Sequence, residues 1–213
     1  MERIEAFLCQ VLPGGLDDLP LKAKVTRFDL SVDVTGVHID SLLAAFPGMQ
    51  VSRGYYKSGK TEALYLGGYE GARHVVMYDK VAEVIHLNAK RKENKPLPPD
   101  PTTRIEIRLR PDVGPVQLTA IENPFLKLIV SSLASVPTPD DQMWKLFVAV
   151  SQFRGAQDAL LMIEDKNMRT KFRERIKVGN PSWWQAEKLW ENWHPLLHET
   201  FMLNSCSKQH QLS

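Results

Sequence analysis

Residues 103–110 read TRIEIRLR, in which polar and apolar side chains alternate strictly from Arg104 to Arg110. Successive side chains of a β-strand point to opposite faces, so this stretch has one apolar face and one charged face. The apolar face carries Ile105, Ile107 and Leu109, and the charged face carries Arg104, Glu106, Arg108 and Arg110. A strand of this kind belongs in an antiparallel sheet that packs one face on a core and leaves the other in solvent.

Three further segments have strand-like sequences, at residues 25–34, 62–66 and 74–80. The last two are separated by GGYEG at residues 67–71, which predicts a turn between neighbouring strands. Short helices are expected at residues 41–46, before Pro-Gly, and at residues 81–92. The second of these runs into a Lys- and Pro-rich loop that cannot continue a helix.

After Pro115 the spacing of the apolar residues becomes helical. Apolar positions recur every three or four residues in four segments, residues 124–135, 139–153, 155–177 and 183–203. The predicted fold class is α+β, an antiparallel sheet with flanking helices followed by a helical C-terminal unit. The expected domains are a sheet-rich core, a helical part and a tail, at residues 1–115, 116–203 and 204–213.

The composition is that of an ordinary globular protein, with 213 residues, 43% hydrophobic and 24% charged. The two cysteines, Cys9 and Cys206, lie near the two ends and predict neither a disulfide framework nor a zinc cluster. No apolar run approaches the roughly 20 residues that span a bilayer, and the N-terminus lacks the pattern of a signal peptide. We therefore expect a soluble, cytoplasmic protein without a membrane partner.

The net charge of +2 is unevenly distributed along the chain. Residues 51–110 carry 12 Lys and Arg against 7 Asp and Glu, whereas residues 1–50 carry 4 against 7. A basic middle third could bind a polyanion, although such an excess is also typical of a solvated face. The same two interpretations apply to the basic stretch at residues 166–177, which could contact the phosphates of a duplex.

Two predicted strands place acidic residues on their charged faces. Asp29 and Glu106 each follow an Arg-apolar pair, at residues 27–28 and 104–105. If the strands are neighbours, both carboxylates can converge on one hard cation, since Mg²⁺ and Mn²⁺ prefer carboxylate oxygens. Asp33 shares the face of Asp29 but lies roughly 13 Å along the strand, so it reaches that metal only if the strand bends. The other interpretation is a solvated face with cross-strand Arg–Glu pairs.

Tyr78 is the candidate nucleophile. It shares a face with His74 and Lys80, and Glu83 follows one helical turn later. A tyrosine hydroxyl with a pKa near 10 is a poor nucleophile at neutral pH. A nearby cation, either Lys80 or a bound metal, would favour the phenolate and polarise the phosphate that it attacks. The alternative is that Tyr78 is half-buried sheet packing, where tyrosine is common.

Four strings in this order resemble the replication initiation factor family, the rolling-circle initiators of plasmids and phages with their related relaxases. They are RFDLSVD at residues 27–33, YLGG at 65–68, YDKVAE at 78–83 and RIEIRLR at 104–110. The family patterns that they match are R-x-D-x-x-x-D, Y-x-G, Y-D-K-x-x-E and R-x-E-x-x-x-R. The resemblance covers residues 24–111 well and the helical remainder only loosely.

The resemblance implies a rolling-circle replication initiator, a metal-dependent DNA endonuclease and strand transferase that nicks an origin. It would act through a covalent 5′-phosphotyrosine, with Tyr78 as the nucleophile. The metal, Mg or Mn, would be held by Asp29 and Glu106 with Asp33 as a helper. The phosphate would be contacted by Lys80 and Arg108.

The partner implied by the resemblance is DNA, at a single-stranded or cruciform origin. A host helicase and polymerase are further implied partners, and a homodimer is left open. The residues expected to contact DNA are Lys57, Lys60, Arg73, Arg104, Arg169, Lys171 and Arg173.

Two features depart from the family pattern. Val76 stands where the family commonly has an arginine, and only about 24 residues precede the first motif. A second hypothesis is therefore a truncated or inactivated initiator that binds DNA without catalysis. A third is a sheet-and-helix interaction module without a DNA role, because the net charge is only +2. The hypotheses differ in whether Tyr78, Asp29 and Glu106 converge in one open groove.

Overall fold

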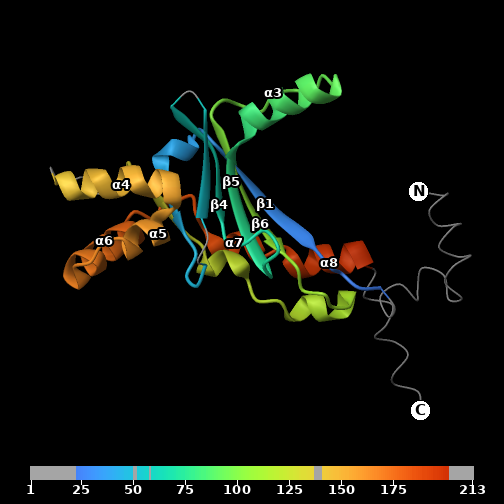
Figure 1. The fold of residues 1–213 in the computed structure, drawn as a ribbon. Coiled ribbons are helices and arrows are strands. Elements are labelled where there is room, and N and C mark those ends of the chain that lie inside the picture. Colours follow the sequence, from blue (N-terminus) through green and yellow to red (C-terminus); the bar gives the residue numbers. More distant parts are fainter. Residues whose placement is uncertain (1–22, 50–51, 58, 137–140, 202–213) are drawn as a thin grey trace, which may run out of the picture. The chain divides into compact units, whose positions relative to one another are not determined.

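The structure, a computed structural model, describes residues 23–49, 52–57, 59–136 and 141–201 (Figure 1). Both cysteines and the predicted tail lie outside these residues. The chain divides into two compact units, each built from separate segments of the sequence. The larger unit comprises Asp29–Leu109 and Pro124–Gln185, and the smaller one contains Arg110–Asn123 together with residues next to the two chain ends.

A five-stranded antiparallel sheet forms the centre of the larger unit, which confirms the predicted α+β class. Its spatial order is β1-β6-β5-β4-β3, so the strand with the alternating TRIEIRLR sequence lies between β1 and β5. The strands are β1 (Phe28–Thr35), β3 (Ser52–Lys57), β4 (Lys60–Leu66), β5 (Arg73–Asp79) and β6 (Thr102–Leu109).

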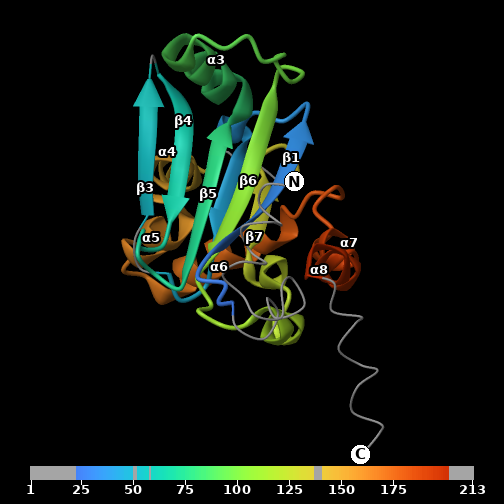
Figure 2. The same ribbon diagram turned by 90° about the vertical axis from the view of Figure 1, so that its right-hand side faces the viewer.

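One face of this sheet is the apolar face that the alternation predicts. Ile105, Ile107 and Val75 are completely buried on it, and Met77 is 1% exposed. Behind this face lie the helices α4 (Gln142–Arg154), α5 (Ala156–Leu161) and α6 (Lys166–Val178) (Figure 2). A second, two-stranded sheet joins them, formed by β2 (Leu42–Ala45) and β7 (Ile129–Ser132).

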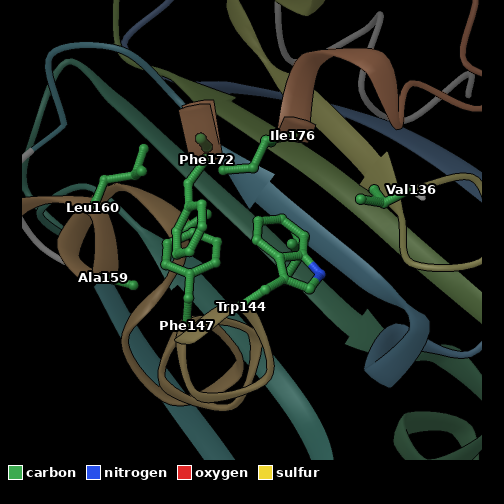
Figure 3. Close-up of a cluster of buried hydrophobic side chains, with 10 residues drawn as sticks. Val136, Trp144, Phe147, Ala159, Leu160, Phe172 and Ile176 are labelled. Carbon is green, nitrogen blue, oxygen red and sulfur yellow. The ribbon is translucent and has the colours of Figure 1, made fainter. Parts of the chain in front are cut away.

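The helices α4, α5 and α6 share an aromatic core with β2 (Figure 3). Trp144 stacks on Phe147 with ring centroids 5.2 Å apart, and Phe172 of α6 meets Trp144 edge-on at 5.0 Å. Gly54 of β3 lets α4 approach the sheet closely, because a Cβ at this position would lie 2.9 Å from the carbonyl oxygen of Phe153. Aromatic rings of this size dominate the energetics of a core.

Helix α3 (Lys80–Arg91) follows β5 directly and lies on the other side of the sheet from α4, α5 and α6 (Figure 1). Asp79 caps its N-terminus, because the Asp79 side chain accepts hydrogen bonds from the backbone N–H groups of Val81 and Ala82 at 2.9 and 3.0 Å. The helix ends at Lys92, which adopts a left-handed conformation. The helix predicted at residues 81–92 is therefore present.

The smaller unit packs around tryptophan. Trp193 stacks on Phe28 with centroids 5.1 Å apart, and its indole N–H donates to the carbonyl oxygen of Leu118 at 3.2 Å. Leu118 belongs to a 3-10 helix, η3 (Pro115–Ala120). The other helices here are α7 (Ala186–Trp190) and α8 (Trp193–Phe201). No helix in the described part of the chain is long and apolar enough to cross a membrane.

The structure corrects four predictions of secondary structure. One is the helix predicted at residues 183–203, whose described part forms two helices, α7 and α8. The helix predicted at residues 41–46 is strand β2, preceded by a 3-10 turn, η2 (Ile39–Ser41). The helix predicted at residues 124–135 is a 3-10 turn, η4 (Pro124–Lys127), followed by β7. Both strands lie in buried surroundings, so their apolar runs lack the alternation that marks a half-exposed strand.

The fourth correction concerns residues 155–177, predicted as one helix. They form α5 and α6, separated at residues 162–165. Asp165 begins α6 by accepting hydrogen bonds from the backbone N–H groups of Asn167 and Met168 at 2.7 and 3.2 Å. In addition, β3 was not predicted, since its sequence SRGYYK offers no apolar alternation.

Candidate functional site

The charged face of the sheet carries the candidate site. The antiparallel register pairs Tyr78 with Arg104 and His74 with Arg108, so these side chains share one face. Helix α3 lies at one end of this face (Figure 2). Residues of α3 and of the strands line an open cavity of about 750 Å³. Tyr78 and Arg108 line the cavity, together with Tyr55, Tyr65 and Glu83.

Tyr78 lies at the end of β5, where the sheet meets α3. Its hydroxyl donates a long hydrogen bond, 3.5 Å, to Oε2 of Glu106 on the neighbouring strand. Burial raises the pKa of Tyr78 to about 12, and the charges of Glu106 and Glu83 act in the same direction. Arg104 acts in the opposite direction but does not offset them. The hydroxyl is therefore protonated at neutral pH.

Glu106 is a buried carboxylate, 9% exposed, with a cation beside it. Its Oε1 accepts a hydrogen bond from Nε of Arg108 at 2.5 Å, while its Oε2 faces Tyr78. Asp29 on β1 approaches the same Arg108 Nε at 3.9 Å. The structure therefore brings Asp29 and Glu106 together, as the sequence predicts, and places a guanidinium between them.

Asp33 lies further along β1 and has a different partner. Its two carboxylate oxygens accept hydrogen bonds from Nε and Nη2 of Arg104 at 2.5 and 2.7 Å. This bidentate pair lowers the pKa of Asp33 and raises the pKa of Arg104. Arg104 thus lies between Asp33 and Tyr78 on the charged face.

The three acidic residues expected to hold a metal are divided between two arginines. Asp29 and Glu106 contact Arg108, and Asp33 contacts Arg104. Among the residues that the structure describes, no group of three or more His, Cys, Asp or Glu side chains is placed to hold a metal ion. This arrangement does not fit a divalent cation, because guanidinium groups occupy the positions beside the carboxylates. The metal stays a prediction from the resemblance.

Lys80 is the first residue of α3 and lies near Tyr78. Its Nζ is 5.8 Å from the centre of the Tyr78 ring and forms a 2.6 Å salt bridge with Glu83. The side chain of Lys80 is 16% exposed, so this pair is largely shielded from solvent. Asp79 holds the start of α3 and thereby fixes where Tyr78 and Lys80 lie relative to each other.

The residues expected to contact DNA fall into two groups. Lys57, Lys60, Arg73 and Arg104 belong to the sheet, where Lys57 approaches Glu62 at 3.8 Å. Arg169, Lys171 and Arg173 belong to α6, which lies behind the opposite face (Figure 2). Within α6, the Arg169 guanidinium donates to the carbonyl oxygen of Ile163 at 2.6 and 3.0 Å and so holds the turn before the helix. The structure does not bring this second group to the Tyr78 cavity.

Sequence reasoning missed the aromatic residues beside the cavity. Tyr55, Tyr65, Tyr69 and His74 form a continuous row of ring contacts on the charged face and at its edge. The signal was present, since all five tyrosines of the chain lie within residues 55–78. Clustered tyrosines are also typical of strands, so the clustering alone does not reveal the ring contacts.

No protein-family model and no curated protein matches the sequence. Among solved structures, the chain is similar to a rolling circle replication initiator protein from Geobacillus stearothermophilus, with 16% sequence identity. The match covers 68% of this chain and 66% of that chain, with a TM-score of 0.28. At this TM-score the similarity supports no conclusion about function, which has to be argued from the site.

Proposed function

We propose that this chain is a rolling-circle replication initiator, a DNA strand transferase that uses Tyr78 as its nucleophile. The observation that carries the proposal is the placement of the Tyr78 hydroxyl. It faces the carboxylate of Glu106, Tyr78 and Arg108 line an open cavity, and Arg104 and Lys80 lie beside Tyr78. A nucleophile, a proton acceptor and several cations on one accessible surface are what phosphoryl transfer requires.

In the proposed reaction, Oη of Tyr78 attacks the phosphorus of a DNA phosphodiester. The new bond joins Oη to phosphorus, and the bond between phosphorus and the 3′ oxygen breaks. The Tyr78 proton passes to Oε2 of Glu106, and the leaving 3′ oxygen takes a proton from solvent. The products are a 5′-phosphotyrosine and a free 3′ hydroxyl, which can prime a host polymerase. Because the phosphotyrosine conserves the bond energy, the same site can reverse the step and rejoin a strand without ATP.

The cations of the site have two tasks in this reaction. Arg108 forms an ion pair with one oxygen of Glu106 and holds the carboxylate in place, so that its other oxygen can accept the proton of Tyr78. Arg104 and Lys80 lie beside Tyr78, where they can stabilise the negative charge that develops on the phosphate oxygens. The proposed reaction therefore uses side chains alone. The predicted Mg²⁺ or Mn²⁺ would require Asp29 and Glu106 to exchange Arg108 for the metal.

One observation favours a second candidate function, binding of DNA without catalysis. The pKa of Tyr78 is raised to about 12, and Glu106 accepts hydrogen bonds on both oxygens. A phenol with this pKa is less ready to react than an ordinary tyrosine. A non-catalytic initiator would keep the open cavity and its cations but would form no covalent adduct.

The experiment that separates the two functions is a nicking assay on supercoiled plasmid and on single-stranded oligonucleotides from candidate origins. It compares the wild-type chain with Tyr78→Phe, with and without Mg²⁺ or Mn²⁺. The matched control is Tyr55→Phe, which removes an exposed hydroxyl from the same cavity. Nicks that disappear in Tyr78→Phe and persist in Tyr55→Phe support the transferase. DNA binding without nicks, equal in all three proteins, supports the non-catalytic function.

A further inference from the structure

A row of four aromatic rings crosses the charged face, and two of them, Tyr55 and Tyr65, line the cavity. It consists of Tyr55 on β3, Tyr65 on β4, His74 on β5 and Tyr69 in the turn between β4 and β5. We call these four residues the aromatic row. Neighbouring ring centroids are 5.3 Å apart between Tyr55 and Tyr65, 5.6 Å between Tyr65 and His74, and 5.9 Å between His74 and Tyr69.

The aromatic row has a buried middle and exposed ends. His74 is 2% exposed and stacks on Tyr65 at an interplanar angle of 24°. Tyr55 and Tyr69 are 57% and 59% exposed, although each contacts the middle of the row with its edge. The inner rings therefore support the outer ones, which present aromatic surface to solvent at low cost in conformational entropy.

Cations lie on both sides of the aromatic row. Arg53 pairs with Tyr65 across β3 and β4, and Arg108 pairs with His74 across β5 and β6. Paired residues of an antiparallel sheet project to the same face, so both guanidinium groups flank the rings. Arg53 is exposed, and Arg108 lines the Tyr78 cavity.

Exposed rings between cations match the chemistry of a single-stranded nucleic acid. Each base has a flat π-face that stacks on an aromatic ring, and each phosphate pairs with a guanidinium. A duplex cannot use such a surface, because its bases are already stacked on one another. A carbohydrate could stack on tyrosine but has no charge for the flanking arginines.

We infer that the aromatic row is a base-stacking site that holds unpaired bases of a single strand beside Tyr78. The inference rests on the proposed function and deepens it, since it names the residues that would position the strand for attack. Tyr55 and Tyr69 stack the bases, while Arg53 and Arg108 hold the phosphates on either side.

The test measures the affinity of the full chain for a fluorescent single-stranded oligonucleotide by anisotropy, at one fixed salt concentration. It compares wild type with the double variant Tyr55→Leu/Tyr69→Leu and with Tyr55→Phe/Tyr69→Phe, which keeps the rings. Both tyrosines are exposed, and circular dichroism melts confirm that each variant is folded. A Leu161→Ala variant, at a position 60% exposed on α5, is the matched control.

We expect the leucine variant to bind at least about fivefold more weakly, since stacking of a base on an aromatic ring is worth about 1–3 kcal/mol. The phenylalanine variant and Leu161→Ala bind like wild type, and a duplex of the same sequence binds more weakly than the single strand. Wild-type affinity in the leucine variant overturns the inference, as does equal loss in the leucine and phenylalanine variants. Equal affinity for the duplex also overturns it.

The two proposals fail separately in this design. If the leucine variant loses affinity but wild type never nicks DNA, the result supports the stacking site and contradicts the transferase. If Tyr78-dependent nicking occurs while the leucine variant binds like wild type, the result supports the transferase and contradicts the stacking site.

Discussion

Nε of Arg108 lies 2.5 Å from Oε1 of Glu106, two residues earlier on the same face of β6. This contact decides what the buried glutamate can do. Glu106 is 9% exposed, and a buried carboxylate needs a charged or hydrogen-bonding partner to offset the loss of its hydration. Arg108 supplies this partner at one oxygen of Glu106, while the other oxygen faces Tyr78. Arg108 is therefore a positioning residue for the proposed proton acceptor.

Arg108→Gln is expected to destabilise the fold by about 2 kcal/mol, because it leaves the buried carboxylate without its charged partner. Urea unfolding followed by circular dichroism measures the change. Combining Arg108→Gln with Glu106→Gln should recover part of the loss, since the buried carboxylate of Glu106 is then replaced by a neutral amide. An unchanged unfolding midpoint in Arg108→Gln would show that the pair contributes nothing.

Tyr78 makes the stability of the fold sensitive to alkaline pH. The pKa of Tyr78 rises from 10.0 to about 12 on folding, chiefly through burial and then through Glu106. Unfolded chains therefore lose this proton first, so the stabilisation is complete below pH 10.0 and is lost as the pH rises to about 12. The free energy of unfolding, measured over this range, should fall less steeply in Tyr78→Phe. If the free energy of unfolding depends on pH in the same way in both proteins, the raised pKa of Tyr78 is contradicted.

Asp79 determines where α3 begins and hence where Lys80 lies. Asp79→Ala removes both side-chain hydrogen bonds to the first turn and should cost about 1 kcal/mol of stability. Asp79→Asn is the control, because an asparagine oxygen can accept the same two hydrogen bonds. Thermal melts that are equally lowered in both variants would mean that the charge, rather than the capping geometry, is what matters.

The Asp33–Arg104 pair predicts the behaviour at acid pH. The pKa of Asp33 is lowered from 3.8 by its hydrogen bonds to Arg104, so the pair stabilises the fold above pH 3.8. This contribution is lost as the pH falls through the lowered pKa. Because Asp33 is 41% exposed, Asp33→Asn should cost no more than about 1 kcal/mol at pH 7. Its stability should also vary less than that of wild type below pH 3.8.

The sequence predicts those strands that have one buried face and one solvent-exposed face. Alternation in β6 and β1 is visible because charged residues such as Arg104 and Asp33 interrupt the apolar ones. In β2 all four residues are buried, so its apolar run has no polar face to reveal the period of a strand. Strand β3 is not predicted because its sequence shows no alternation of apolar and polar residues. Tyr55 and Tyr56 point to opposite faces of the sheet, so the two faces of this strand look alike in the sequence.

The candidate site is predictable as a set of residues but not as a set of contacts. The alternation places Asp29, Glu106 and Tyr78 on the charged faces of their strands, and the structure brings them to one surface. Which carboxylate meets which arginine depends on the cross-strand register, which the sequence alone does not specify. For that reason the sequence, which assigns Arg108 to the phosphate, does not predict that its guanidinium also contacts Glu106 and Asp29.

The measurement that tests the central claim most directly is the chemical identification of a covalent link between Tyr78 and DNA. Single-stranded oligonucleotides from candidate origins are incubated with the wild-type chain, digested with nuclease and protease, and examined by mass spectrometry. The account predicts a nucleotide phosphate attached to the peptide that contains Tyr78, and no modified peptide from Tyr78→Phe. Cleaved DNA whose phosphate is attached to another residue, or cleavage that persists in Tyr78→Phe, would contradict the account.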